Sequence, residues 1–273
     1  ILLEIIFNNY VNKEQIFRKI KRLLSFELSL KNLESSIHSL NLCYNTINKN
    51  KKLITYNEKF GENIIKYDGK ILKPTSFFKK QLQNQIFKKY LIDSTYYSLE
   101  KFKGLFLKNG YYGGFVLYRK YSRKDVFRIL CFDKQPVGQN VGGYLIAPDK
   151  SNCPIFINYH KSDDISSSTK YEDKFISYKT LKWYSKSNRT LKSKDVSTIR
   201  DHNDLRLPLF IKKSNDEGRD YYFMGDVTPA RDSFKEEKMV NEKGKKIPVV
   251  SLNLHLDVPV EKSLFNYITD EDT

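Results

Sequence analysis

The feature that most constrains the fold is a series of short apolar or alternating runs, each bounded by turn residues, that fills the chain beyond residue 140. Such runs are typical of β-strands, in which successive side chains point to opposite faces of a sheet. They cover residues 142–147, 154–159, 171–177, 181–185, 207–212, 221–227 and 248–258, and a short helix is expected over 260–268. At least six closely spaced strands predict a β-sandwich or a β-barrel.

Two of these runs lie within residues 170–190, and we expect them to form a hairpin around a short turn. In the simplest register Phe175 lies opposite Trp183, and Asp173 lies opposite Ser185. The odd-numbered residues then share one largely aromatic face. The even-numbered residues carry more charge and are expected to face solvent.

Asp173 is the unusual member of this aromatic face, because a buried polar group without a partner costs about 1–3 kcal/mol. Its partner can be a backbone amide or Ser185, in which case the carboxylate only ties the hairpin. Alternatively, the partner is a ligand with hydrogen-bond donors and a flat face. A nucleobase flipped out of a duplex is such a ligand, because it stacks on aromatic rings and is read at its edge.

The charge of the chain is unevenly distributed. The net charge is +16, and residues 1–103 carry 19 basic and 9 acidic residues, 104–200 carry 18 and 8, and 201–273 carry 11 and 15. A lysine-rich proteome would explain a general surplus of positive charge. The reversal of sign near residue 200 instead favours one basic face suited to phosphates and an acidic flank away from it.

The N-terminal part predicts a small, mostly helical module over residues 1–103. Apolar residues recur at helical spacing before residue 45, Ser29 or Lys31 is a candidate helix start, and Asp68–Gly69 predicts a hairpin. A helix is expected from Pro74 to about Tyr90, with its apolar stripe buried. A cluster of glycines after residue 103 marks the predicted boundary, so the fold class is α+β with domains at 1–103 and 104–273.

Several kinds of chemistry are not indicated by the sequence. It has no phosphate-binding P-loop, no dinucleotide fingerprint and no histidines at metal-ligand spacing, so we expect no cofactor, no metal site and no catalysis. A loop with His160, Asp163 and Asp164 is a weak candidate for a metal or nuclease cluster. Three widely spaced cysteines argue against disulfides, no run is apolar enough to span a membrane, and the chain begins without Met. We therefore expect a cytoplasmic fragment of a longer protein.

Seven segments of the β-rich half together resemble one known assembly. They are Lys108-Asn-Gly-Tyr-Tyr-Gly-Gly, Tyr121-Ser-Arg-Lys-Asp-Val-Phe-Arg-Ile-Leu, Tyr171-Glu-Asp-Lys-Phe, Trp183-Tyr-Ser-Lys-Ser-Asn-Arg-Thr, Leu209-Phe-Ile-Lys-Lys-Ser, Tyr222-Phe-Met-Gly-Asp-Val and Leu256-Asp-Val-Pro-Val. The assembly is the C-terminal region of SauUSI-type enzymes, which are modification-dependent type IV restriction enzymes with a phospholipase-D-like nuclease and a superfamily-two helicase. The resemblance spans roughly residues 100–270, and residues 1–100 resemble the helical coupling segment only loosely.

This resemblance implies an SRA-like, PUA-related β-barrel that flips a modified cytosine into an aromatic pocket. Tyr171 and Trp183 would stack on the base, Phe175 and Ser185 would shape the wall, and Asp173 would accept from the exocyclic amine of cytosine. Phosphates on either side would be held by a second set of residues: Arg119, Arg123, Lys124, Lys186 and Arg189. The nuclease and helicase motifs are absent from this chain, so it should neither cleave DNA nor hydrolyse ATP.

Three functions follow as alternatives. The first is a target-recognition module for double-stranded DNA with 5-methylcytosine or 5-hydroxymethylcytosine, attached to the helicase and nuclease domains of the parent chain. The second is a DNA clamp that ignores modification, in which the aromatic residues are only core. The third is an interdomain scaffold without DNA binding. A binding series with modified and plain duplexes separates all three.

Overall fold

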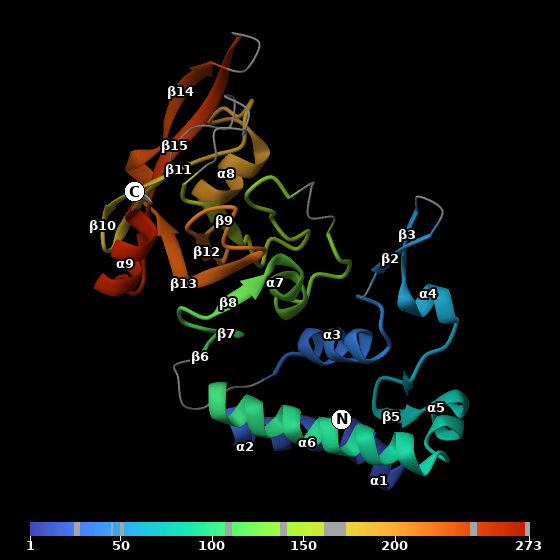
Figure 1. Cartoon of the computed structure of the whole chain (residues 1–273). Helices are drawn as coiled ribbons and strands as arrows, with labels where there is room; N and C mark the ends of the chain where they lie inside the picture. The colour runs from blue at the N-terminus through green and yellow to red at the C-terminus, as the bar shows by residue number, and fades with distance from the viewer. Residues whose placement is uncertain are drawn as a thin grey trace. The chain divides into compact units, whose positions relative to one another are not determined.

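The computed structural model describes residues 1–24, 28–44, 46–49, 52–106, 111–136, 141–160, 173–240 and 245–270 (Figure 1). The chain divides into two compact units. The first contains Ile1–Tyr111 and Phe127–Gln135, and the second contains Tyr112–Val126 and Pro136–Thr273. The first unit thus extends beyond the predicted boundary at residue 103 and includes a short later segment.

The first unit combines helices with a small sheet. Its elements are α1 (Leu2–Asn8), β1 (Val11–Asn12), α2 (Lys13–Leu24), α3 (Leu30–Leu40), β2 (Thr46–Lys49), β3 (Lys52–Thr55), α4 (Tyr56–Phe60), β4 (Ile65–Tyr67), β5 (Ile71–Pro74), α5 (Ser76–Gln81) and α6 (Gln85–Phe106). Strands β1, β5 and β4 pair antiparallel, and the hairpin predicted at Asp68–Gly69 is confirmed. Ser29 caps α3 as one of the two predicted starts.

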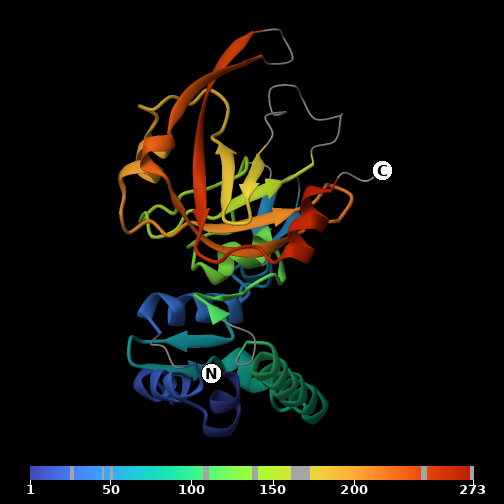
Figure 2. The ribbon, with the colours of Figure 1, turned by 90° about the vertical axis from the view of Figure 1, so that its left-hand side faces the viewer.

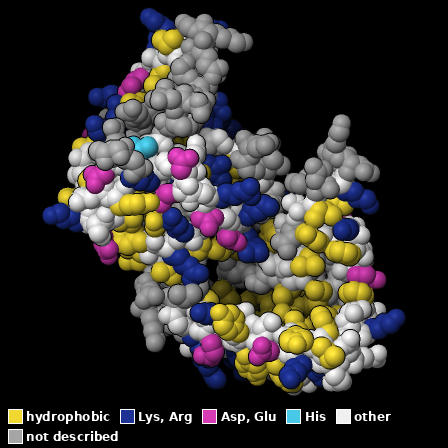
Figure 3. Space-filling view, in the orientation of Figure 1, with side chains coloured by type: hydrophobic (Ala, Val, Ile, Leu, Met, Phe, Trp, Pro, Cys, Tyr) yellow, Lys and Arg dark blue, Asp and Glu magenta, His cyan; other side chains and the backbone are white. Residues whose placement is uncertain are grey.

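The helix predicted from Pro74 to Tyr90 is wrong in two respects. The chain breaks between α5 and α6, and α6 then continues as one helix of 22 residues. Phe78 is buried, but Ile86 is 69% exposed and Phe87 is 41% exposed. Hydrophobic side chains accordingly lie at the surface along α6 (Figure 3). The apolar residues recur at helical spacing as predicted, but the break at residues 82–84 leaves the second half of the stripe exposed.

The second unit is built on one curved sheet (Figure 2). The elements from Tyr111 onward are β6 (Tyr111–Tyr112), β7 (Phe115–Val116), β8 (Lys120–Ser122), α7 (Arg123–Ile129), β9 (Ile155–Asn158), β10 (Lys174–Ser177), β11 (Thr180–Tyr184), α8 (Lys194–Asp201), β12 (Pro208–Lys212), β13 (Asp220–Pro229), β14 (Lys235–Val240), β15 (Lys246–Leu256) and α9 (Lys262–Thr269). The strand order is β10-β11-β15-β13-β12-β9, with β14 also paired to β15 and β8 to β13. The mixed helix-and-sheet class predicted from the sequence is confirmed.

Most neighbouring strands of this sheet are antiparallel, but β9 and β12 run parallel, with Leu209 opposite Ile155. One core cluster packs against the sheet, and its fully buried members include Leu181, Leu209, Met224 and Leu254. Alternate residues of β12 and β13 are buried in a separate aromatic cluster that includes Phe210 and Phe223. Gly113 occupies a left-handed conformation beside the guanidinium of Arg206, where an added Cβ would lie 2.7 Å from it. That guanidinium is held by two bonds to Asp226, of 2.7 and 3.0 Å, and by one to the carbonyl of Gly113, of 2.7 Å.

The hairpin of β10 and β11 forms, but its predicted register is wrong by two residues. Phe175 lies opposite Leu181 rather than Trp183, because a shift in register before Ser177 and Thr180 leaves only two residues in the turn. A shift of two keeps every side chain on its face. Phe175, Trp183 and Ser185 are therefore still buried.

Three further differences concern elements in the second unit. Residues 142–147 do not form the predicted strand, and only Tyr144 makes an isolated bridge, to Ile155. Helix α8 and strand β14 were not predicted. Among the residues that the structure describes, no helix is both long and apolar enough to pass through a membrane.

Candidate functional site

The candidate site begins at the end of β11, in the segment Tyr184–Lys186. The backbone N–H of Tyr184 donates a hydrogen bond of 3.0 Å to the carboxylate of Asp173. Asp173 is only 6% exposed. It therefore has the backbone partner that was one of the two alternatives named from the sequence, and this bond fixes the start of β10 against the end of β11.

The two aromatic pocket candidates lie in the hydrophobic core. The ring of Phe175 stacks on Tyr159 at 5.7 Å and contacts Phe265 at 5.2 Å. The ring of Trp183 meets Tyr144 edge-on at 5.1 Å. Since these neighbours already cover both rings, a base could stack on them only after the neighbours had moved. Tyr171 lies outside the described residues.

Ser185 connects β11 to the rest of the sheet. It is 1% exposed, its hydroxyl accepts a hydrogen bond of 2.9 Å from the backbone N–H of Val250, and it donates one of 3.1 Å to the carbonyl of Lys186. The backbone position of Lys186 is thereby fixed by a buried bond network.

Lys186 lines a cavity of about 620 Å³, which we call the α8 cavity. Its walls are the segment 144–150, the chain after β11, and the first turns of α8. The side chains that give it polar character are Tyr144, Lys150, Lys186, Arg189, Ser193, Lys194, Asp195 and Thr198. Two predicted phosphate contacts, Lys186 and Arg189, are therefore brought together here.

Sequence reasoning missed Tyr144, Lys150, Lys194 and Asp195. The sequence pattern predicted a strand at residue 144 and no helix between residues 190 and 206. A signal for α8 was present, because Ser193 precedes a run whose two buried apolar residues, Val196 and Ile199, are three apart. The pairing of these side chains across 50 residues of sequence carried no such signal.

Asp195 organises the polar groups of the α8 cavity. Its carboxylate accepts a hydrogen bond of 2.6 Å from the hydroxyl of Tyr144 and one of 2.7 Å from Nε of Arg189. Burial alone would raise the pKa of Asp195, but these two bonds and the charge of Arg189 outweigh it and hold the pKa below its usual value. Burial raises the pKa of Tyr144, and the bond to Asp195 adds to that effect.

The remaining cations give the α8 cavity a positive balance. The ammonium of Lys186 lies 4.6 Å from the centre of the Tyr144 ring. Burial lowers the pKa of the Lys186 ammonium. Lys150 and Lys194 are exposed at the cavity wall. With Arg189, four cations face one carboxylate, an arrangement that suits an anionic ligand such as a phosphodiester chain.

The other predicted phosphate contacts lie elsewhere in the second unit. Arg123 packs over Phe156 at 5.2 Å and over Tyr221 at 5.3 Å. Arg119 lies 6.0 Å from the ring of Tyr121, and Lys124 is exposed on α7. None of the three lines the α8 cavity. The described residues also contain no group of three or more acidic, histidine or cysteine side chains placed to bind a metal ion.

Residues 115–268 match a sequence family described as a domain of unknown function, DUF3427, and this match covers more than half of the chain. The chain belongs to the DUF3427 family. The DUF3427 region contains β7 to most of α9, so the whole α8 cavity and the β10–β11 hairpin lie within it. It also falls within the part of the chain whose motifs resemble the restriction enzymes described above. No curated protein matches the sequence.

Solved structures that are similar to this DUF3427 chain include the following two. One is described as the DNA modification-dependent restriction endonuclease AspBHI, with 12% identity, a TM-score of 0.35, and coverage of 54% of this chain and 77% of that one. The other is KRYPTONITE in complex with mCHG DNA and SAH, with 10% identity, a TM-score of 0.30, and coverage of 60% and 38%.

Proposed function

We propose that this DUF3427 chain is a DNA-binding target-recognition module that reads 5-methylcytosine or 5-hydroxymethylcytosine by base flipping. The observation that carries the proposal is the double role of the segment Tyr184–Lys186. At one end its backbone holds the buried carboxylate of Asp173, and at the other it places Lys186 in the α8 cavity. A group able to read a base edge and a group able to bind phosphate are thus fixed to the same three residues.

The α8 cavity supplies the sequence-independent part of binding in this proposal. Cations that neutralise phosphates release counterions, and this term dominates the affinity of proteins for DNA. Lys150, Lys186 and Lys194 bind the backbone of the duplex, while Arg189 is oriented by Asp195. Arg119, Arg123 and Lys124 contact phosphates farther along the duplex.

Asp173 supplies the base-reading part. A carboxylate accepts hydrogen bonds from the exocyclic amine of cytosine, which is the donor that distinguishes this base. Trp183 and Phe175 are covered by the core, so we assign them the positioning of the hairpin behind Asp173 and Ser185. Tyr171 provides the stacking ring. The curved sheet then acts as an SRA-like, PUA-related barrel.

The proposal also covers the parent protein. The motifs that resemble SauUSI-type enzymes suggest that this module serves an ATP-dependent restriction enzyme, whose helicase and nuclease domains perform the chemistry. The chain itself contributes binding and no catalysis. Double-stranded DNA with a modified cytosine and those two domains are its partners.

The decisive measurement is fluorescence anisotropy with three matched duplexes that carry cytosine, 5-methylcytosine or 5-hydroxymethylcytosine at one position. We expect one or both modified duplexes to bind more tightly. Asp173→Asn should abolish this preference, because the amide oxygen can still accept from Tyr184 but the new NH₂ group opposes the amine of cytosine. Lys174→Gln is the control, since Lys174 is the exposed neighbour on the opposite face.

The outcomes separate the alternatives. Equal affinity of the wild-type chain for all three duplexes would make the module a clamp that ignores modification, a function favoured by the packing of Phe175 and Trp183 in the core. Absence of duplex binding at moderate salt would leave a scaffold. A preference that survives in Asp173→Asn would move the base pocket away from the β10–β11 hairpin.

A further inference from the structure

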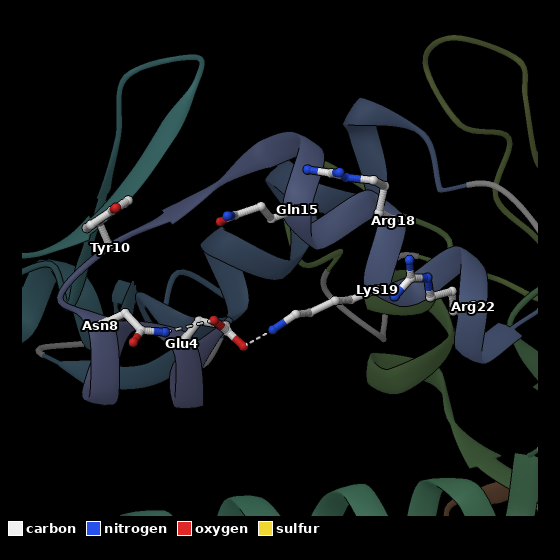
Figure 4. Close-up of a pocket in the computed structure, with 7 residues that line it drawn as sticks. All are labelled: Glu4, Asn8, Tyr10, Gln15, Arg18, Lys19 and Arg22. Carbon is white, nitrogen blue, oxygen red and sulfur yellow. Dashed lines mark hydrogen bonds and ion pairs between the residues drawn. The ribbon is translucent and has the colours of Figure 1, made fainter.

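The first unit, outside the DUF3427 match, contains a polar cavity of about 410 Å³ where α1 ends and α2 begins. We call it the α2 cavity. Its lining side chains are Glu4, Asn8, Tyr10, Gln15, Arg18, Lys19 and Arg22 (Figure 4). Tyr10 and Asn8 lie at one end, Arg18 and Arg22 at the other, with Gln15 and Lys19 between them (Figure 4).

One end of the α2 cavity has the groups that recognise a nucleobase. Tyr10 is 51% exposed, so one face of its ring can accept a stacked base. The amide of Asn8 donates to Glu4 at 3.0 Å, which leaves its carbonyl oxygen directed elsewhere as an acceptor. Gln15 accepts from the backbone of Asn12 at 3.3 Å, so its NH₂ group can donate. Ring, acceptor and donor occur within one small cavity.

The other end has a surplus of positive charge. Lys19 is paired with Glu4, and this bond lowers the pKa of the Glu4 carboxyl. That pair is internally neutral. Arg18 and Arg22 are one helical turn apart on the same side of α2 and are exposed. Each guanidinium presents a planar set of N–H donors, and two such groups one helical turn apart suit a phosphate group.

We propose that the α2 cavity binds one nucleotide of an unpaired nucleic-acid strand. The base stacks on Tyr10 with its edge toward Asn8 and Gln15, and its phosphate lies between Arg18 and Arg22. The volume is within the range of small-ligand sites. A continuous strand fits better than a free nucleotide, because α2 carries five basic and one acidic residue and so extends positive charge beyond the cavity toward neighbouring phosphates.

This site gives the first unit a role of its own. It does not depend on the duplex-reading function proposed for the second unit, because none of its residues belongs to that unit. A module that holds an unpaired strand in one unit and a duplex in the other would fit a chain that works beside a strand-separating motor.

The test uses the full chain and a 12-nucleotide thymidine strand in which one base is replaced by 5-iodouracil. Ultraviolet irradiation links this base to an aromatic ring stacked on it, and peptide mass spectrometry then locates the link. We expect the link at Tyr10 and its loss in Tyr10→Leu. Truncation of a stacking ring should also weaken strand binding about tenfold in fluorescence anisotropy.

A second pair of variants tests the phosphate end. Arg18→Gln/Arg22→Gln should lower the magnitude of the slope of log affinity against log salt by about 0.7, since both arginines contact the same phosphate and each phosphate contact with a single strand contributes about 0.7. Lys80→Gln/Lys89→Gln removes the same charge from exposed positions of the first unit and should leave the slope nearly unchanged.

Three results would overturn the proposal. The first is a cross-link only at sites other than Tyr10. The second is an equal salt slope for Arg18→Gln/Arg22→Gln and its lysine control. The third is displacement of the strand by thymidine monophosphate at a concentration equal to that of the strand. Lys150→Gln/Lys194→Gln, which acts on the α8 cavity, should leave strand cross-linking at Tyr10 intact. Failure of duplex reading and failure of strand binding are therefore separately visible.

Discussion

Removal of the two exposed lysines of the α8 cavity gives a quantitative prediction for duplex binding. Lys150 and Lys194 line the cavity and are exposed, so Lys150→Gln/Lys194→Gln should fold normally. A cation that neutralises one phosphate of duplex DNA contributes about 0.9 to the slope of log affinity against log salt. The double variant should therefore lower the magnitude of the slope by about 1.8.

The same relation gives the loss of affinity. Because 0.1 M and 1 M salt differ tenfold, each phosphate contact raises the duplex affinity at 0.1 M by a factor of about 8 relative to 1 M. Loss of two contacts should therefore weaken the duplex affinity at 0.1 M about 60-fold. Fluorescence anisotropy with one unmodified duplex at salt concentrations from about 0.05 to 0.3 M measures both quantities. The range is chosen because the slope, rather than one affinity, reports the number of phosphates contacted.

Lys179→Gln/Lys262→Gln is the matched control. Both lysines are exposed. Lys179 lies in the turn of the β10–β11 hairpin, at the end of β11 opposite Lys186, and Lys262 lies on α9. They carry the same charge as the cavity pair. Charges more than about 10 Å from the DNA are largely screened at 0.1 M salt, so the control should change affinity by no more than about twofold. Equal effects of the two double variants would show that the α8 cavity has no special part in duplex binding.

Three further predictions concern stability, measured by urea unfolding. Asp195→Asn should lower the free energy of unfolding by about 1–3 kcal/mol at neutral pH, because the bonds of this side chain to Tyr144 and an arginine are weakened. Since the folded-state pKa of Asp195 is lowered, the difference from the wild type should be complete above the ordinary Asp pKa of about 4 and should shrink as the pH falls below it. A difference that does not depend on pH would contradict the ionic account. Gly113→Ala should lower the free energy of unfolding by about 2–3 kcal/mol, because the new Cβ displaces the guanidinium of Arg206 and the backbone is left-handed there. A loss below about 0.5 kcal/mol would mean that this arginine moves freely. Trp183→Phe should cost about 1–3 kcal/mol through lost core packing, with the duplex affinity measured in parallel; a stable variant that loses only DNA binding would instead place the ring in the base pocket.

The sequence was most informative for elements that depend on residues close together in the chain, such as strands with a clear apolar pattern, helix caps and tight turns. Strands β9, β12, β13 and β15 were located within a few residues, because alternation and apolar runs reflect burial directly. The start of α3 and the Asp68–Gly69 hairpin were located from the local chemistry of capping and turn residues. In the hairpin of β10 and β11 the buried face was correct, since face depends only on parity, whereas register depends on turn length.

The α8 cavity could not be predicted, because it depends on the approach of segments far apart in sequence. Tyr144 and Asp195 meet across 51 positions, and no local pattern records such a pair. The exposed face of α6 was missed for a related reason: an apolar stripe states which side chains could be buried, but only the tertiary arrangement decides whether a partner covers them. Asp173 is an intermediate case, in which the need for a partner was clear but its identity was not.

The parallel pairing of β9 and β12 has a consequence for how this domain forms. The two strands are neighbours in the sheet, yet about 50 residues separate them, and that excursion includes the β10–β11 hairpin and α8. Closing so long a loop delays their association relative to the local hairpins, but lengthening it further costs little, because closure entropy grows only with the logarithm of length. The excursion can therefore change in length and sequence, and with it what the domain recognises, while the strands that anchor its ends keep their register.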